Sequence, residues 1–465
     1  MGSGRQVVVL GGSAGGLLTA LVLANGGNPV TVLERDAEPP PRDADEAWNS
    51  WQRRGVPQFR QPHGLPVRFM DVLDAELPAV AATVRSIAPS TGLAGSAPNP
   101  DELTDRERAF SIVLVRRPTL EMLLAEAADA HPDIEVRRGC AATGLVLGPS
   151  EAGRLHVIGV STGDGGTVTG DIVVDCSGRR SAVGGWLAEL GSPIEESAEP
   201  DGFTYASRWF HLSGDPPTLK AGTFGGVGPG LLSLIFPSDG NAVGIAMVGS
   251  ARDPLFRRVQ RPEPFMAVAR SFPLVAEWLE PGGFEPITDI MPMGSIQNRM
   301  TRLRRDDTSG PVGIINTSDA FASTNPSLGR GLGITADLAV RLRDLLADEP
   351  DAVALVDRWD DVQQRCHKPW LDDSIASDAN LRSGFDALLG DDPGDIPHPW
   401  RSNLAKAAGL DLDCWRAVNS VNQILASPTT WLDDTELLDR AATLAAELPP
   451  ATPSMTRAEL EELTA

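Results

Sequence analysis

The chain has 465 residues, enough for two or three domains with buried cores, and its composition is that of a globular protein. Its 40 basic and 63 acidic residues give a net charge of −23, which argues against nucleic acid and anionic membranes as partners. No apolar run approaches the ~18 residues of a membrane span, the N-terminus leads directly into a strand rather than a signal peptide, and the four cysteines show no CxxC spacing. We therefore expect a cytoplasmic protein with free thiols and no membrane span.

The opening segment predicts a strand, a glycine-rich turn, a helix and a second strand. The apolar run 7–10 precedes the turn from Gly11 to Gly16, and the second strand ends at Glu34, 18 residues after Gly16. Glycines allow the backbone to approach a pyrophosphate at a helix N-terminus, and a carboxylate at this distance accepts hydrogen bonds from a ribose. Ser13 replaces the second glycine of G-x-G-x-x-G, and its hydroxyl can bond the phosphate instead. The pattern predicts a dinucleotide site; the alternative is an ordinary glycine-rich βα turn.

Two further basic positions are candidates for the same site. Residues 53–64 lack periodicity and are dense in Arg, Gln and His, which indicates an ordered loop with a function. His63 in this loop is a candidate for contact with cofactor or substrate, the alternative being a structural histidine. Arg117 begins a predicted helix over 117–130, where its guanidinium can face an anion; the alternative is a solvated surface arginine.

The middle of the chain predicts a change of architecture. Strands are predicted at 134–136, 143–147, 156–161 and 171–175, the last returning to the opening sheet, with a helix capped by Ser181 behind it. From 203 to 296, apolar runs at 231–236 and 242–248 flank an Asp-Gly hairpin signal. This pattern predicts an antiparallel sheet inserted between parts of the first domain.

The last buried strand, 311–316, leads into the glycine-rich turn 317–333 and a helix to Leu346. A turn of this kind at the start of a helix predicts a second anion or dipole cradle. Beyond residue 350 the pattern predicts helices, including an amphipathic one over 437–448, and we expect the last dozen residues to fray.

Three separated segments carry a resemblance to a known family. They are the Gly11–Gly16 turn with Glu34, the segment Asp175-Cys176-Ser177-Gly178, and Ser318-Asp319 followed by Asn325-Pro326-Ser327-Leu328-Gly329-Arg330-Gly331. In this order they resemble the class A FAD-dependent monooxygenases, the aromatic-hydroxylase-like superfamily. The loop 54–63 is similar to the R-K-G-V-P-Q-x-R-H-x-H segment of actinobacterial polyketide-tailoring monooxygenases, with the polyene epoxidases nearest. Ser13, Ser318 and Gln61 depart from the family pattern.

The resemblance implies an α/β fold: a Rossmann-type FAD-binding domain, an inserted antiparallel β-sheet substrate domain and C-terminal helices. The implied divisions are FAD-binding parts at 1–80, 120–195 and 301–350, a cap region at 81–120, the sheet domain at 196–300 and the helical region at 351–465.

The resemblance also implies which residues contact FAD. Ordered along FAD from the adenine to the ring, they are Arg35 at the adenine, Glu34 at the ribose, Gly11, Ser13, Ala14 and Gly16 at the pyrophosphate, Arg117 and Asp319 at the ribitol, and Pro326, Gly329, Gly331 and Leu332 at the isoalloxazine.

The implied reaction inserts one oxygen atom of O2 into a lipophilic, polyketide-like small molecule, by epoxidation or hydroxylation through a C4a-hydroperoxyflavin. NAD(P)H, or a partner flavin reductase, would supply the electrons. His63 and Arg208 are the candidate catalytic side chains, and no metal is expected. An apolar pocket over the ring is predicted from the sheet residues Trp209, Phe210, Leu231, Ile235, Phe236 and Met247, whose alternative role is plain core packing.

Other flavin chemistries are weighed against this reaction. A halogenase is disfavoured because the chain has no W-x-W-x-I-P segment and its first lysine is Lys220. A flavin-dependent saturase of prenyl or polyene chains stays open, as does a non-catalytic protein that holds flavin or a natural product.

Overall fold

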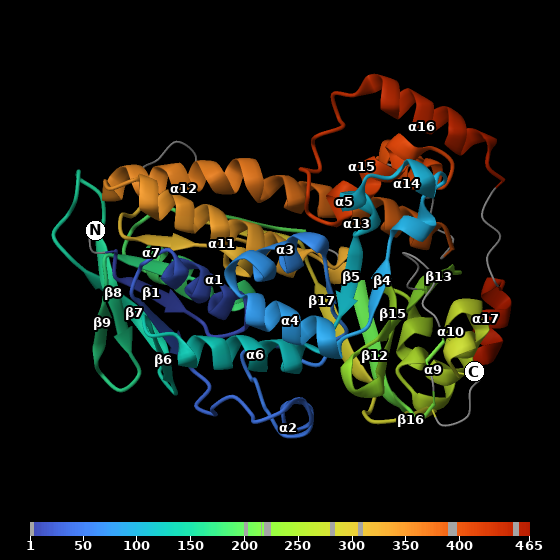
Figure 1. Cartoon of the computed structure of the whole chain (residues 1–465), viewed down its shortest axis with the longest axis horizontal. Coiled ribbons are helices and arrows are strands. Elements are labelled where there is room, and N and C mark those ends of the chain that lie inside the picture. The colour runs from blue at the N-terminus through green and yellow to red at the C-terminus, as the bar shows by residue number, and fades with distance from the viewer. Residues whose placement is uncertain are drawn as a thin grey trace.

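The structure is a computed structural model that describes residues 4–199, 203–214, 216–217, 225–279, 284–305, 310–388, 398–449 and 455–465. A five-stranded parallel sheet with the order β19-β10-β1-β2-β6 forms its first layer (Figure 1). Its strands are β1 (Val7–Leu10), β2 (Val30–Glu34), β6 (Ile134–Arg138), β10 (Ile172–Asp175) and β19 (Ile314–Asn316). The predicted return of the chain to the opening sheet is thus confirmed.

Helices cover one face of this sheet. They are α1 (Ala14–Asn25), α6 (Arg117–Ala130), α11 (Gly331–Asp348) and α12 (Ala352–Cys366), and α3 (Val67–Glu76) and α4 (Pro78–Ile87) pack on the outside of α1, α6 and α11. Because side chains alternate along a strand, Val7 and Val9 pack against these helices while Val8 and Leu10 point to the opposite face.

A second, antiparallel sheet lies against that opposite face. It consists of β7 (Ala142–Leu147), β8 (Val157–Thr162) and β9 (Thr167–Thr169), with α7 (Val183–Glu189) beside it. The predicted strands in this region are confirmed. The N-cap of α7 is Ala182 rather than the predicted Ser181, whose hydroxyl lies one residue earlier and accepts the Val183 N–H at 3.1 Å.

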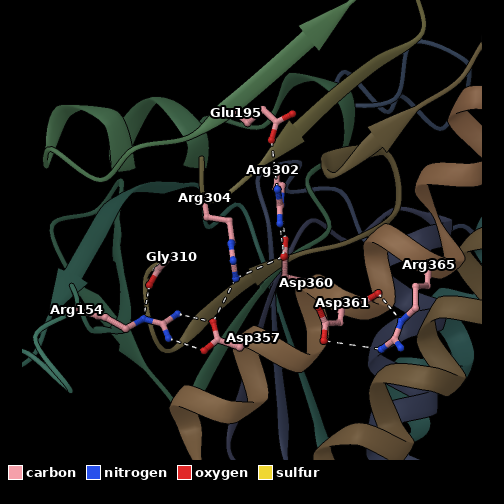
Figure 2. A network of polar contacts seen from close by, with 9 residues as sticks. All are labelled: Arg154, Glu195, Arg302, Arg304, Gly310, Asp357, Asp360, Asp361 and Arg365. Atoms are coloured by element: carbon pink, nitrogen blue, oxygen red, sulfur yellow. Dashed lines mark hydrogen bonds and ion pairs between the residues drawn. The ribbon is translucent and has the colours of Figure 1, made fainter. Parts of the chain in front are cut away.

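Ion pairs join α12 to strands from outside the helical layer (Figure 2). Arg154, close to β8, bonds Asp357 of α12 at 2.9 and 3.1 Å and the Gly310 carbonyl at 2.6 Å. Arg302 bonds Asp360 of α12 at 2.6 and 2.7 Å. Arg302 ends β18 (Arg299–Arg302), which pairs with β11 (Glu195–Ala198) and β20 (Ala322–Ser323).

The predicted antiparallel sheet is present between β10 and β19. Its strands are β12 (Phe203–Leu212), β13 (Gly225–Gly228), β14 (Leu231–Pro237), β15 (Ala242–Ser250), β16 (Phe284–Pro286) and β17 (Met291–Ile296). A tight turn joins β14 to β15, with Gly240 at φ 65° and Asn241 at φ 53°, the left-handed conformation that Gly and Asn adopt in hairpins.

The two faces of this sheet have different partners. Phe210, Leu231, Ile235 and Met247 pack on the helices α8 (Pro254–Val259), α9 (Pro262–Ser271) and α10 (Pro273–Leu279). The opposite face carries Tyr205 and Trp209 from β12 and, by register, Leu234, Phe236, Ala246 and Val248 from β14 and β15. Of the predicted pocket residues, only Trp209 and Phe236 lie on this face, so the prediction is wrong for the other four.

The remaining elements complete the chain. Short ones are α2 (Ala44–Asn49), β3 (Gly64–Leu65), β4 (Ser90–Gly92), α5 (Asp105–Arg108), β5 (Ser111–Leu114) and the 3-10 turns η1 (Ala94–Ser96), η2 (Pro100–Glu102), η3 (Gly178–Arg180), η4 (Asp239–Asn241), η5 (Ser318–Ala320) and η6 (Pro326–Leu328). The C-terminal helices are α13 (Lys368–Leu388), α14 (Pro399–Ala407), α15 (Leu412–Asn422), α16 (Thr435–Glu447) and α17 (Arg457–Leu463). Within the described residues, none of the helices combines the length and apolarity needed to cross a bilayer.

The predicted fraying of the last dozen residues is wrong. Thr456 and Glu459 form a capping box at the start of α17, and Leu460 is fully buried against the helices of the antiparallel sheet. Arg457 also forms an ion pair with buried Asp253 at 2.7 Å. The end of the chain therefore packs on the inserted sheet domain, at the right of Figure 1.

Candidate cofactor and active site

The turn between β1 and α1 is so tight that it requires glycine at two positions. Gly11 has φ 99°, and a Cβ on Gly16 would lie 1.8 Å from the Gly11 carbonyl oxygen. Ser13 is the N-cap of α1, yet its side chain makes no capping hydrogen bond. The first N–H groups of α1, from Ala14 on, therefore point out of the helix without a side-chain acceptor, and this geometry fits a diphosphate.

Glu34 lies beside this turn, where the spacing predicts it. Its buried carboxylate accepts hydrogen bonds from the N–H groups of Gly12 and Asp36, both at 2.8 Å, and from Arg53 Nη2 at 2.8 Å. Arg53 also donates to the Gly12 carbonyl at 2.9 Å. The Arg35 guanidinium lies over Gly55, where an added Cβ would lie 3.0 Å from it. Arg53 was not predicted individually, because nothing in the local pattern distinguishes it from Arg54.

A second group of charges continues from Arg53. Arg117, the first residue of α6, bonds Glu121 at 2.7 Å and meets His63 Nε2 at 3.3 Å. Glu121 has no exposed surface, and its other oxygen lies 3.3 Å from Arg53 Nη1. His63, Arg117, Glu121, Arg53 and Glu34 thus form a continuous polar chain. The i,i+4 spacing of Arg117 and Glu121 on one helix face is the sequence signal that could have identified Glu121.

His63 is neutral in this arrangement. Its Nδ1 lies 2.7 Å from the Gln61 carbonyl, so we assign the proton to Nδ1 and the acceptor role to Nε2, which faces Arg117. Burial, and then the positive charge of Arg117, lower the pKa of His63 to about 3. A neutral imidazole here serves as a hydrogen-bond acceptor for Arg117.

The stability of the fold is expected to fall on acidification. Burial lowers the pKa of both His63 and His367 to about 3, whereas the unfolded chain binds these protons near pH 6.5. Because the folded-state pKa is the lower one, stability is lost as the pH falls from about 6.5 toward 3, by up to about 1.4 kcal/mol per pH unit for each histidine. Urea unfolding at several pH values checks this: His367→Gln should reduce the slope, exposed His211→Gln should not, and equal slopes for all three proteins would contradict the assignment.

The turn after β19 meets the first turn. Ser318 has φ 53°, which explains why glycine is usual at this position, and its hydroxyl lies 2.6 Å from Thr335 Oγ1 of α11. A Cβ on Gly15 would lie 3.4 Å from the Ser318 hydroxyl oxygen, so the two turns are neighbours. Within the described residues no donor bonds the Asp319 carboxylate; burial raises its pKa, and Arg117 and Arg179 oppose that rise. This carboxylate can accept hydrogen bonds from the hydroxyl groups of a ligand.

The backbone just before and at the start of α11 is not covered by neighbouring atoms at its glycines. Gly329 has φ 64°, and a Cβ on Gly329 or Gly331 would meet no atom within 4 Å. The N-cap of α11, Arg330, makes no side-chain capping bond, which leaves the first N–H groups free. Pro326 begins η6 in the same segment, whereas the Leu332 side chain packs into the core under α1.

The structure does not bring Arg208 to this cluster. Its Nε donates to the Thr288 carbonyl at 3.1 Å, and its guanidinium lies 5.6 Å from the centre of the Phe210 ring, on the helix-covered face of the sheet. Tyr205, on the same strand but the opposite face, donates its hydroxyl to the Asn325 side chain next to Pro326. Strand alternation separates the two residues, and the sequence does not indicate which face meets the site.

These features together define a fold. The parallel sheet with its glycine-rich turn, the inserted antiparallel sheet and the C-terminal helices are the fold of the class A FAD-dependent monooxygenases, so the predicted fold class is confirmed. No family model matches the sequence.

The similar solved structures have several activities. The Diels-Alderase PyrE3 of pyrroindomycin biosynthesis aligns with a TM-score of 0.60 and 19% identity over 90% of this chain and 80% of its own. The anhydrotetracycline hydroxylase OxyS from Streptomyces rimosus aligns at 0.58 and 19% over 90% and 76%. The flavin-dependent halogenase CmlS aligns at 0.59 and 16% over 100% and 77%. At these identities the likeness establishes the fold alone.

Two curated proteins are similar in sequence. Protein Rv3254 of Mycobacterium tuberculosis (strain ATCC 25618 / H37Rv) is 29% identical over 368 residues, 73% of each chain. Kynurenine 3-monooxygenase of Salinispora arenicola (strain CNS-205) is 29% identical over 185 residues, 38% of this chain and 37% of its own.

Proposed function

We propose that the chain binds FAD and uses it to insert one oxygen atom of O2 into a lipophilic small molecule, by epoxidation or hydroxylation. The observation that carries this proposal is the meeting of the two glycine turns, in which Gly15 lies against Ser318 while the neighbouring Asp319 carboxylate has no donor within the described residues. A long ligand such as FAD, in which the diphosphate is followed by the hydroxyl groups of the ribitol chain, matches that sequence of groups. Bound FAD would supply the reduction of O2 and the transfer of its oxygen atom.

The residues present fit FAD in order along its length. The free N–H groups of α1 would hold the diphosphate, and Glu34, oriented by Arg53, would hold the ribose. Asp319 and Arg117 would hold the ribitol. The open backbone from Gly329 to Gly331 would face the ring, where the positive end of the α11 dipole favours negative charge.

The substrate would lie against the sheet face that carries Tyr205. The register places uncharged side chains on this face: Tyr205, Ser207, Trp209, Leu232, Leu234, Phe236, Ala246, Val248, Met291 and Met293. Such a surface desolvates an apolar molecule and excludes water from the reacting atoms. Similar folds occur in the Diels-Alderase PyrE3 of pyrroindomycin biosynthesis and in the anhydrotetracycline hydroxylase OxyS, and this supports a polyketide-like substrate. In this proposal His63 orients Arg117, and Arg208 has a structural role.

Replacing Asp319 tests the cofactor site within this proposal. Asp319→Ala is expected to raise the FAD dissociation constant about 10- to 100-fold, because hydrogen bonds to a charged group contribute about 1.5–3 kcal/mol. Fluorescence titration of FAD measures this. Asp372→Ala, a change of an exposed carboxylate on α13, should leave the constant unchanged. Equal constants for Asp319→Ala and the unmodified chain would contradict the assigned role.

Oxygen uptake tests the reaction. The FAD-loaded chain should consume O2 and NAD(P)H in a substrate-stimulated manner, with NAD(P)H acting directly or through an added flavin reductase, and should give a product heavier by one oxygen atom. Reduction of a polyene without O2 uptake would indicate the saturase alternative. Binding of flavin and substrate without turnover would indicate a binding protein.

A further inference from the structure

Helix α13 lies in the C-terminal helical region, between the sheet domain and α12 in Figure 1. Two of its carboxylates are buried: Asp373 is 6% exposed and Asp378 is 4% exposed. Neither belongs to a segment that carries the family resemblance. Each, however, binds one end of the short segment from Asn325 to Arg330. No other atom lies within 4 Å of an added Cβ at Gly329 of this segment.

Asp378 holds the first end of the segment. Asn325 Nδ2 donates to both of its oxygens, at 2.9 and 3.0 Å, and Asn298 Nδ2 donates to one of them at 2.7 Å. Asn298 in turn accepts the backbone N–H of Asn325 at 2.8 Å, and Tyr205 donates its hydroxyl to the Asn325 side-chain oxygen. Every polar group of the Asn325 side chain is therefore engaged, so its position is fixed.

Asp373 holds the other end. Its carboxylate binds Arg330, which is 2% exposed, and also Arg401 of α14 at 2.6 and 2.7 Å. Arg330 donates a further bond to Asn422 of α15 at 2.9 Å, and its guanidinium lies 5.2 Å from the centre of the Trp370 ring. A buried arginine with these partners has one orientation, and it forms the N-cap of α11.

We propose that α13 is a positioning element of the cofactor site, in which Asp373 and Asp378 fix the two ends of the ring-facing segment Asn325–Arg330. The inference rests on the proposed function, since it assigns this segment to the flavin ring. Between the fixed ends lie Pro326, Ser327, Leu328 and Gly329, which form the single 3-10 turn η6 and its C-cap, closed by a hydrogen bond from the Gly329 N–H to the Pro326 carbonyl at 2.9 Å. Displacing either end would move the backbone from Gly329 to Gly331, and with it the N–H group of Gly331, relative to the ring.

The test replaces Asp378 by its isostere. In Asp378→Asn, the new amide NH2 group cannot accept the hydrogen bonds that Asn325 and Asn298 donate to the carboxylate. The Asn325 end of the segment is therefore no longer held in place. We expect the FAD dissociation constant to rise at least about tenfold. Asp373→Asn should have an effect of the same order, and the matched control Asp372→Asn should have none, because Asp372 is exposed on the same helix and bonds only Lys368 among the described residues.

A second readout requires no flavin. Tyr205 is the only tyrosine of the chain, so tyrosine labelled with ¹³C at Cζ gives a single resonance that reports its hydrogen bond to Asn325. This resonance should shift in FAD-free Asp378→Asn and remain unchanged in Asp372→Asn.

The outcomes separate this inference from the proposed function. An FAD affinity equal to that of the unmodified chain in folded Asp378→Asn or Asp373→Asn overturns the inference, as does a Tyr205 resonance that does not shift in Asp378→Asn. An unmodified chain that binds no FAD overturns the proposed function instead.

Discussion

Gly16→Ala is expected to raise the FAD dissociation constant at least about 100-fold. The added Cβ would lie 1.8 Å from the Gly11 carbonyl oxygen and 3.4 Å from Cys176 Cβ, so backbone rather than a flexible side chain must move. That movement separates the start of α1 from the end of β1 and disperses the N–H groups that would bind the diphosphate. Titration of FAD by fluorescence measures the change.

Gly185→Ala is the matched control for this change. Gly185 lies in α7, is exposed, and has no atom within 4 Å of its would-be Cβ. Alanine there should leave FAD binding unchanged and stabilise the helix by up to about 1 kcal/mol. Retention of full affinity in Gly16→Ala would show that the first turn is not the diphosphate site.

Asp239→Ala is expected to lower the free energy of unfolding by about 3–5 kcal/mol, since it leaves a buried arginine unpaired. Asp239, at the tip of the β14–β15 hairpin, accepts the Arg116 N–H at 2.7 Å and its guanidinium at 2.8 and 3.0 Å. It also accepts the Thr119 hydroxyl at 2.8 Å. These bonds connect the sheet domain to the start of α6, next to Arg117, so we expect FAD binding to weaken as well.

Urea unfolding measures this loss, and an exposed ion pair provides the comparison. Arg85 and Asp74 are 46% and 48% exposed, so Asp74→Ala should cost less than about 1 kcal/mol. Equal losses for Asp239→Ala and Asp74→Ala would contradict the view that the buried pair holds the two domains together.

The fold follows from the sequence wherever the determining pattern is local. The Gly11–Gly16 turn, Glu34 at the end of β2 and the Asp-Gly hairpin at 239–240 each depend on backbone preferences over a few residues, and each is present in the structure. The fraying predicted for the last dozen residues was wrong because tertiary contacts of Leu460 stabilise a helix too short to persist alone.

The site is only partly predictable, for a different reason. Arg53 and Tyr205 act through partners far away in the chain, and a single sequence contains no signal of such pairings. The alternation of β12 predicts that Arg208 and Tyr205 lie on opposite faces, but the choice of face depends on what packs there. In the same way, the acidic residues of α13 give no indication that Asp373 and Asp378 are buried against Arg330 and Asn325.

A crystal structure of the chain with bound FAD tests the central claim most directly. The account predicts one cofactor whose diphosphate meets the N–H groups after Ser13, whose ribitol meets Asp319, and whose ring lies along Gly329–Gly331. FAD bound elsewhere on the chain, or failing to bind at saturating concentration, would contradict it.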